Sequence, residues 1–228
     1  MPDFAYADLA KMIDHSLLQP TLTDDDLERG CRLAREYDVA SVCIKPYAVR
    51  RAVELLAGST VVVGTTIGFP HGGHVTEIKK AESRQAAADG AKELDMVVNI
   101  GKVLSGDWKY VADDVRAVVE QAHRDGAIVK VIFENCFLND AQKEQLCRIC
   151  GEVGADFVKT STGYGDSGAT DDDLRLMRRC SPPRVQVKAA GGVRTFERLV
   201  AVRALGVTRV GATATKVILD ECKAKLKG

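Results

Sequence analysis

Short apolar segments alternate with longer amphipathic segments along the whole chain, and this alternation restricts the fold more than any other feature. The apolar segments are rich in β-branched residues and are too continuous to be strands with one face in water, which is typical of buried parallel strands. Eight of them occur, at residues 12–18, 39–44, 60–69, 93–100, 127–134, 156–162, 184–190 and 208–213. The 228 residues therefore form repeats of about 28, close to a minimal strand–helix unit.

The segments between the apolar runs carry signals for helix ends. Thr23 and Thr170 each precede three aspartates, and Asn139 precedes one, as expected of helix N-caps followed by an acidic first turn. Glycines stand shortly before four of the apolar runs, where a left-handed helix C-cap needs them: Gly90, Gly126, Gly154 and Gly206. The pattern predicts eight strands and eight helices in βα order.

Right-handed crossovers between parallel strands leave two topologies, a closed eightfold barrel and an open doubly wound sheet. The open sheet usually has a glycine-rich turn after its first strand. Here residues 17–23 read LLQPTLT, without glycine. The sequence therefore favours an α/β fold of the single (β/α)8 TIM-barrel type. Because no linker, low-complexity tract or charge block interrupts it, we expect one domain over residues 1–228.

Composition narrows the classes of partner. The chain has 32 basic and 32 acidic residues, so its formal net charge gives no reason to expect nucleic acid or an anionic membrane. The N-terminal segment lacks the apolar core of a signal peptide, and residues 60–69 are too few to span a bilayer. Seven scattered cysteines are typical of a reducing compartment. We expect a cytoplasmic protein.

Cys147 and Cys150 form a C-x-x-C pair. A redox pair of this kind needs a helix N-terminus, and these cysteines lie in the later half of a predicted helix. A zinc site usually needs a second such pair, which the sequence lacks. The pattern favours two cysteines on one helix face that pack inward.

Four ionisable residues interrupt the apolar runs: Asp95, Lys130, Lys159 and Lys188. The lysines are 29 residues apart, one βα period, which predicts similar levels on three successive strands. A single lysine could point outward with its head in water. Three matched lysines and a carboxylate instead favour a shared lining at the C-terminal mouth of the barrel, where active sites of this fold lie.

Such a cluster suits a nucleophilic amine. A lysine with a pKa of about 10.4 is neutral in only about one part in 10³ at pH 7, and a neighbouring ammonium and an apolar wall both lower that pKa. A lysine nucleophile, a second lysine and a proton-carrying carboxylate form a minimal class I aldolase site. Spacing alone leaves open which lysine attacks.

Seven segments, in this order and over nearly the whole chain, resemble the deoxyribose-phosphate aldolase family: IDHSLLQP, VCIKPY, GFPHG, ELDMVVNIG, VKVIFE, ADFVKTSTGYG and VKAAGGVRT. The resemblance implies a lyase that reversibly cleaves 2-deoxy-D-ribose 5-phosphate to D-glyceraldehyde 3-phosphate and acetaldehyde through a lysine Schiff base. It implies no cofactor and no metal. By analogy with relatives, we expect a homo-oligomer, a dimer or larger.

The resemblance also assigns roles to residues. Lys159 is the Schiff-base lysine, and Lys188 is the neighbour that lowers its pKa. Asp95, with an ordered water, carries protons. Lys130 supports the network, and Asp14 extends the relay.

Glycines and one threonine at the ends of the last three predicted strands, or just after them, suit a phosphate site: Gly163, Gly191, Gly192, Gly211 and Thr213. Barrels often bind phosphate with the loops after strands 7 and 8, and glycine lets backbone N–H groups approach the oxygens. The alternative is that these are ordinary turn glycines.

The chain departs from the family at Asn135, where many relatives have threonine, at Ala190, where serine is frequent, and at Thr213–Thr215, where several have serines. These departures leave two alternatives open. One is a Schiff-base aldolase for a different phosphorylated sugar or a keto acid. The other is a barrel that binds a sugar phosphate without cleaving it, which would not need the matched Lys159 and Lys188.

Three histidines and one cysteine have alternative interpretations. His71 and His74, with His15, could form the zinc site of a class II aldolase, but the glycines between the first two leave such ligands poorly fixed, so we expect no metal site. Cys43 either reaches the mouth as a reactive thiol or is a buried, inert one.

Overall fold

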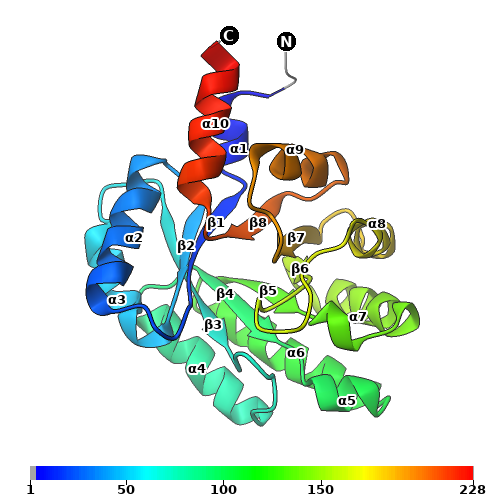
Figure 1. The fold of residues 1–228 in the computed structure, drawn as a ribbon. Helices are drawn as coiled ribbons and strands as arrows, with labels where there is room; N and C mark the ends of the chain where they lie inside the picture. The colour runs from blue at the N-terminus through cyan, green and yellow to red at the C-terminus, as the bar shows by residue number, and fades with distance from the viewer. Residues whose placement is uncertain (1–3, 228) are drawn as a thin grey trace.

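Eight parallel strands close into a barrel within residues 4–227, the part of the chain that this computed structural model describes (Figure 1). Each strand pairs with the next in sequence and β8 pairs with β1, so the predicted barrel is confirmed and the open sheet is excluded. The strands are β1 (Ile13–Leu17), β2 (Ser41–Ile44), β3 (Val62–Ile67), β4 (Glu93–Val97), β5 (Ile128–Ile132), β6 (Phe157–Lys159), β7 (Gln186–Ala190) and β8 (Arg209–Ala212). Residues 1–3 and 228 of the predicted 1–228 domain lie outside the described residues.

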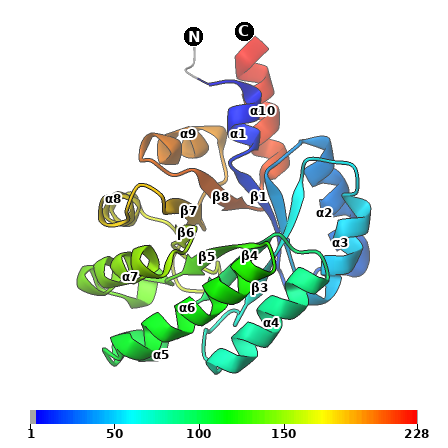
Figure 2. The ribbon, with the colours of Figure 1, turned by 180° about the vertical axis from the view of Figure 1, so that it is seen from behind.

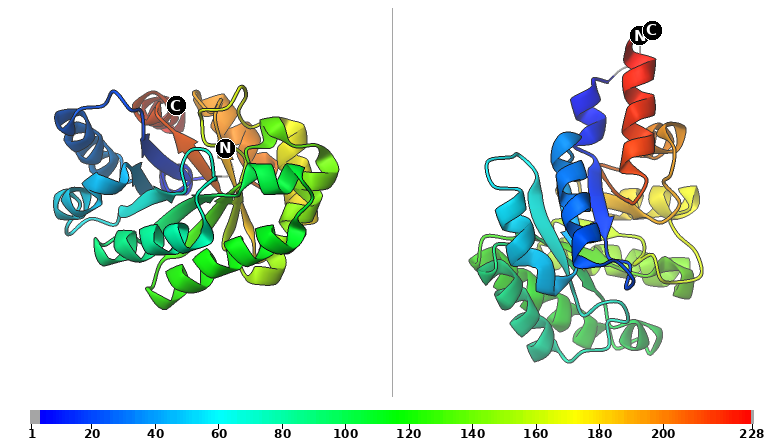
Figure 3. Two further views of the ribbon diagram at one scale, coloured as in Figure 1. Left: turned by 90° about the horizontal axis from the view of Figure 1, so that it is seen from below. Right: turned by 60° about the vertical axis from the view of Figure 1, so that its left-hand side comes forward.

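A helix follows every strand and the helices surround the barrel, as Figures 1 and 2 show from opposite sides. The eight predicted helices are α2 (Asp24–Glu36), α3 (Val49–Leu55), α4 (Thr76–Ala88), α6 (Trp108–Arg124), α7 (Asp140–Val153), α8 (Asp171–Cys180), α9 (Phe196–Ala204) and α10 (Thr215–Lys227). The structure adds α1 (Tyr6–Ala10), α5 (Ile100–Leu104) and the 3₁₀ turns η1 (Pro46–Ala48) and η2 (Asn135–Phe137). Helix α1 lies beside α10 (Figure 3).

The predicted helix ends are confirmed. The side chains of Thr23, Asn139 and Thr170 each accept a hydrogen bond from the backbone N–H three residues later. The four predicted C-terminal glycines all have positive φ, between 75° and 104°. The helices therefore begin and end where local hydrogen bonding and glycine conformation require.

Successive residues of a strand face two different environments, the apolar layer under the helices and the interior of the barrel. On β4 and β5, Leu94, Met96, Val129 and Val131 are fully buried in the apolar cluster that includes the helices. The residues between them, such as Asp95 and Lys130, point the other way, into the barrel interior. Burying both faces explains why these strands read as continuous apolar runs.

Cys147 and Cys150 are fully buried in the second half of α7, so the prediction of inward packing is confirmed. Burial raises the pKa of Cys147 to about 12 and that of Cys150 well above its ordinary value. Thiols with such pKa values are poor nucleophiles. No helix within residues 4–227 combines the length and apolar character needed to cross a membrane.

A buried ion pair holds the end of β4. The ammonium of Lys79 on α4 donates to Asp114 Oδ2 on α6 at 2.6 Å and to the carbonyl of Val97 at 2.9 Å. The two charged side chains are 0% and 1% exposed. Val97 is two residues after Asp95, so this pair fixes the part of the strand that carries that carboxylate.

We predict that Asp114→Ala lowers the free energy of unfolding by about 3–5 kcal/mol, because it leaves the Lys79 ammonium buried without a counter-ion. Urea denaturation measures the change. The control is the double variant Lys79→Met/Asp114→Leu, which removes both charges and should cost much less. A single variant as stable as the double one would contradict this account.

Candidate active site

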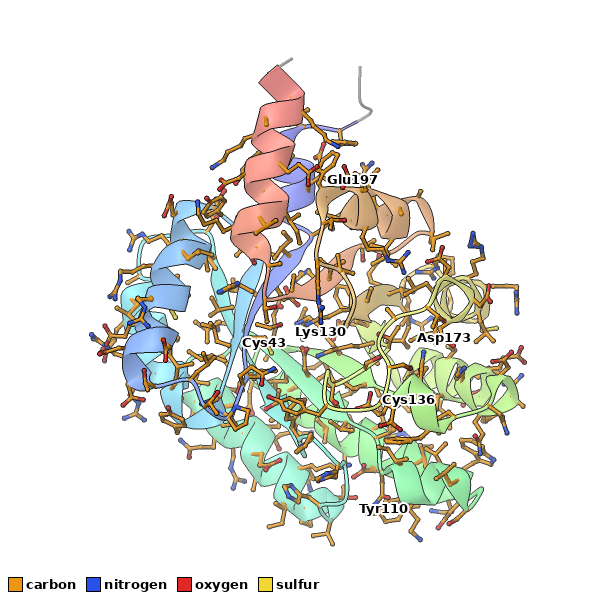
Figure 4. All side chains as sticks on the ribbon, viewed as in Figure 1. Cys43, Tyr110, Lys130, Cys136, Asp173 and Glu197 are labelled. Atoms are coloured by element: carbon orange, nitrogen blue, oxygen red, sulfur yellow. The ribbon has the colours of Figure 1, made fainter. Side chains whose placement is uncertain are left out.

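Seven charged side chains from six strands meet inside the barrel: Asp14, Glu93, Asp95, Lys130, Lys159, Lys188 and Arg209, here called the interior charge cluster. Six of them are buried, and the side chain of Arg209 is 14% exposed. Figure 4 labels Lys130 and Cys43 near the centre of the barrel. Charged groups at this depth are stable only when they pair with one another.

Asp95 is the acceptor that three lysines share. Its Oδ2 accepts hydrogen bonds from Lys159 Nζ and Lys188 Nζ, both at 2.7 Å, and its Oδ1 accepts one from Lys130 Nζ at 2.9 Å. Lys159 and Lys188 are also direct partners in the β6–β7 register. The two lysines therefore face one carboxylate on the same wall of the barrel.

The prediction that all three lysines occupy similar levels is wrong for Lys130. In the β5–β6 register Lys130 aligns with Phe157, whereas Lys159 aligns with Ile132, two residues further along the strand. Equal spacing in the sequence also counts loop and helix residues, and strands in a closed barrel are staggered. Lys130 therefore reaches Asp95 from the deeper side.

Below Asp95 the interior charge cluster continues. Asp14 Oδ2 lies 2.6 Å from Lys188 Nζ and 3.4 Å from Lys130 Nζ. Lys130 also donates to Glu93 at 2.6 Å. Sequence reasoning missed Glu93 and Arg209, although each shares strand parity with a residue it had selected, Asp95 for the first and Gly211 for the second.

The three lysines differ in how many carboxylates hold them. Lys130 contacts three and Lys188 two, whereas Lys159 contacts only Asp95. Burial lowers the pKa of Lys159, and the Lys188 ammonium lowers it further against the pull of Asp95. Burial also opposes the charge on Lys188 and Lys130, but Asp14 and Asp95 outweigh it and raise the pKa of both. Lys159 is therefore the lysine that most readily becomes a neutral amine.

A cavity of about 160 Å³ opens above Lys159 at the C-terminal ends of the strands. All five residues predicted for phosphate line it together with Lys159: Gly163, Gly191, Gly192, Gly211 and Thr213. Gly191 has φ +80°, and a Cβ there would lie 2.7 Å from the Cα of Gly168, so the position requires glycine. Ser16, Thr162 and Arg194 also line the cavity, and sequence reasoning had not selected them.

Tyr164 ties together three loops at the mouth. Its hydroxyl donates to the carbonyl of Leu18 at 2.8 Å, and its ring packs edge-on against Phe69 with centroids 5.6 Å apart. The preceding turn is held by the buried Glu134, whose carboxylate accepts hydrogen bonds from the backbone and the hydroxyl of Thr162. The loop after β6 is thus fixed on both sides of Gly163.

The departures from the family divide into two groups. Ala190 and Thr213 line the cavity. Asn135 is buried and donates to Met177 Sδ at 3.3 Å, and the Thr215 hydroxyl lies 2.8 Å from His15 Nδ1. Neither residue lines the cavity. Only the first group can touch a ligand in this cavity.

The histidines take part in other contacts. Burial lowers the pKa of His15 to about 4, and His74 Nδ1 lies 3.3 Å from Glu82. Within residues 4–227, no three side chains of the types that bind metal ions are grouped as a metal site requires. Cys43 Sγ lies 3.9 Å from Asp95 Oδ2, and burial raises its pKa to about 11, so this thiol reaches the cluster in its protonated form.

Known proteins resemble this chain over nearly its whole length. Residues 9–215 match the model of the DeoC/LacD family aldolases. The chain is 58% identical to a deoxyribose-phosphate aldolase of Rhodopirellula baltica over 99% of this chain and 94% of the relative. It is 47% identical to one of Thermococcus gammatolerans, over 93% and 96%. The solved deoxyribose phosphate aldolase of Aeropyrum pernix, described as tetrameric, superposes with a TM-score of 0.89 at 30% identity, over 97% and 93%.

We predict that the interior charge cluster makes stability fall in acid. Lysine neighbours outweigh burial and hold the pKa values of Asp14 and Asp95 below their ordinary 3.8. Because the folded pKa values are depressed, the stabilisation is complete above 3.8 and is lost as pH falls below it. Urea denaturation between about pH 6 and about pH 3 measures this loss.

The variant Asp95→Asn tests the part of this pH dependence that comes from Asp95, by comparison of its free energy of unfolding with that of wild type. It should be less stable than wild type by about 3–5 kcal/mol at pH 6, because three lysines lose their shared carboxylate. The difference should shrink as pH falls below 3.8, because Asp95 then takes up a proton in the unfolded wild-type chain while it stays ionised in the folded one. A difference that stays constant with pH would show that the ionisation of Asp95 contributes nothing.

Proposed function

The chain belongs to the DeoC/LacD family of aldolases, and from this premise we propose that its substrate is 2-deoxy-D-ribose 5-phosphate. The products are D-glyceraldehyde 3-phosphate and acetaldehyde, and the reaction is reversible. The observation that carries the proposal is the pair of amines, Lys159 and Lys188, that share Asp95 Oδ2 at 2.7 Å. Lys159 is held by this carboxylate alone, so it can lose its proton and act as the nucleophile.

The first half of the reaction forms the imine. The neutral amine of Lys159 adds to the C1 aldehyde of the open-chain sugar to give a carbinolamine. A proton delivered from water to its hydroxyl lets that group leave as water and gives a protonated imine. Asp95 accepts a hydrogen bond from this imine nitrogen. Lys188 and Lys130 keep Asp95 ionised, so the new positive charge meets a carboxylate already in place.

The second half breaks and remakes bonds at C2. The C3 hydroxyl loses its proton, the C2–C3 bond breaks, and its electron pair moves into the imine to give an enamine on Lys159. C3 leaves as the aldehyde carbon of glyceraldehyde 3-phosphate. Protonation of C2 and hydrolysis of the imine then release acetaldehyde and restore the amine. Asp95, with a water and with Asp14 behind Lys188, carries the protons.

The cavity that contains Lys159 suits a phosphorylated end of the substrate. Its glycines after β7 offer backbone N–H groups next to the start of α9, and Arg194 adds a positive charge. Thr213 adds a hydroxyl. Because Ala190 and Thr213 are the family departures that line this cavity, we infer that they adjust which phosphorylated sugar binds best, and turnover of several sugar phosphates would rank them.

The oligomeric state and the cellular compartment can be inferred from a relative and from the cysteines. By analogy with the tetrameric relative of Aeropyrum pernix, we infer that this chain forms a homo-oligomer. All seven cysteines are free, which suits a reducing compartment such as the cytoplasm.

We predict that sodium borohydride, added together with 2-deoxy-D-ribose 5-phosphate, traps a stable adduct on Lys159. Mass mapping of peptides identifies the modified lysine. Lys159→Met should form no adduct and lose at least about 10³-fold in turnover, because the nucleophile is absent. EDTA should leave the wild-type rate unchanged. An adduct on Lys188 or Lys130 alone would overturn the assignment.

We predict that Arg194→Gln raises KM for the phosphorylated sugar by about 10- to 100-fold, the value of one charged hydrogen bond, with kcat little changed. Steady-state kinetics with unphosphorylated 2-deoxyribose should show no such loss. Arg198→Gln is the matched control, since Arg198 pairs with Asp171 and does not line the cavity. An equal rise in KM for both sugars would argue against phosphate binding by Arg194.

A further inference from the structure

The interior charge cluster has unequal numbers of the two charges. It contains four basic side chains, Lys130, Lys159, Lys188 and Arg209, and three carboxylates, Asp14, Glu93 and Asp95. With every group ionised, the barrel interior would hold one uncompensated positive charge. With Lys159 neutral, the charges balance.

We propose that Arg209 is a positioning residue for the reaction, because its fixed charge pairs with Asp14 and Glu93 and leaves Lys159 with only its share of Asp95 to hold a proton. The proposal rests on the proposed function only in taking Lys159 as the nucleophile. Nothing in the reaction itself brings substrate to Arg209, which begins β8 at the end of the barrel opposite the cavity.

The contacts connect Arg209 to Lys159 by two routes. Its Nη1 donates to Asp14 Oδ1 at 2.7 Å and to Glu93 at 2.9 Å, while the guanidinium lies over the Phe157 ring at 5.4 Å. Asp14 then contacts Lys188, and Glu93 contacts Lys130. Both of these lysines donate to Asp95, the acceptor of Lys159.

Strands β2 and β3, which contribute nothing to the interior charge cluster, add no charge beside Asp95. Besides the interior charge cluster, the titratable group that faces Asp95 is Cys43 on β2, whose thiol stays protonated. Strand β3 has no titratable residue. The described residues thus place no further charge beside Lys159.

Arginine and lysine play different parts here for a physical reason. A guanidinium keeps its proton at any physiological pH, so Arg209 is a fixed charge. A buried group of charges approaches neutrality by releasing a proton from its most weakly held site. Lys159, with one carboxylate contact, is that site.

Removing the charge of Arg209 should therefore raise the protonated fraction of Lys159, although the two side chains are not in contact. In Arg209→Gln, three lysines face three carboxylates, and the neutral fraction of Lys159 at pH 7 should fall about tenfold. Glu93→Gln should change it in the opposite direction. The double variant Glu93→Gln/Arg209→Gln restores the original balance, and Arg209→Lys preserves it.

The test measures the charge of Lys159 without substrate. Limiting acetic anhydride is applied between about pH 6 and about pH 10, and peptide mass spectrometry compares acetylation of Lys159 with that of Lys109, whose side chain is 89% exposed. We expect the Lys159 profile to move to higher pH in Arg209→Gln and to lower pH in Glu93→Gln. The double variant and Arg209→Lys should return towards the wild-type profile.

A purely structural role for Arg209 predicts a different result. Both single variants would then move the pH profile of Lys159 acetylation in the same direction, and the double variant would move it further than either. That outcome overturns the proposal, and so does a wild-type profile in folded Arg209→Gln. If Arg209→Gln does not fold, the Glu93→Gln profile decides. Borohydride trapping is scored separately, so a missing wild-type adduct contradicts the proposed function whatever the acetylation profile shows.

Discussion

One buried carboxylate, that of Asp95, makes the interior of this barrel possible. Three strands each send a lysine to it, and without this shared acceptor the buried amino groups would lose their common hydrogen-bond partner and the charged ones would repel one another where water cannot screen them. The hydrogen bonds also fix the positions of the lysine side chains, which on a surface would be mobile. Catalytic geometry and structural stability therefore depend on the same few contacts.

The way the strands divide their two faces explains how an aldolase site fits into a small barrel. Outward residues such as Met96 and Val131 join the apolar layer under the helices, which provides the burial that stabilises the fold. Inward residues are thereby free to carry charge. The end of β4 is held from outside by Lys79 and Asp114, so the strand that presents Asp95 is restrained on both faces.

Much of the architecture could be predicted from the sequence, because strand burial, helix caps and left-handed glycines are local effects that leave local patterns. The lysines and Asp95 could be found because charge inside an apolar run is unusual. The depth of Lys130 could not, since spacing does not report the stagger between β5 and β6. Glu93 and Arg209 stand at strand starts, where a charged residue looks like an ordinary strand boundary. Tyr164 and Arg194 depend on loop conformation, which no periodic pattern encodes.

The interior charge cluster draws on the first strand and the last, with Asp14 on β1 and Arg209 on β8. A nascent or partly unfolded chain cannot assemble it, because these residues are brought together only when the ring of strands is complete. Until then, Lys159 is an ordinary solvated lysine that is almost entirely protonated at neutral pH and so condenses only slowly with aldehydes. The readily deprotonated amine therefore arises only once the first and last strands have met.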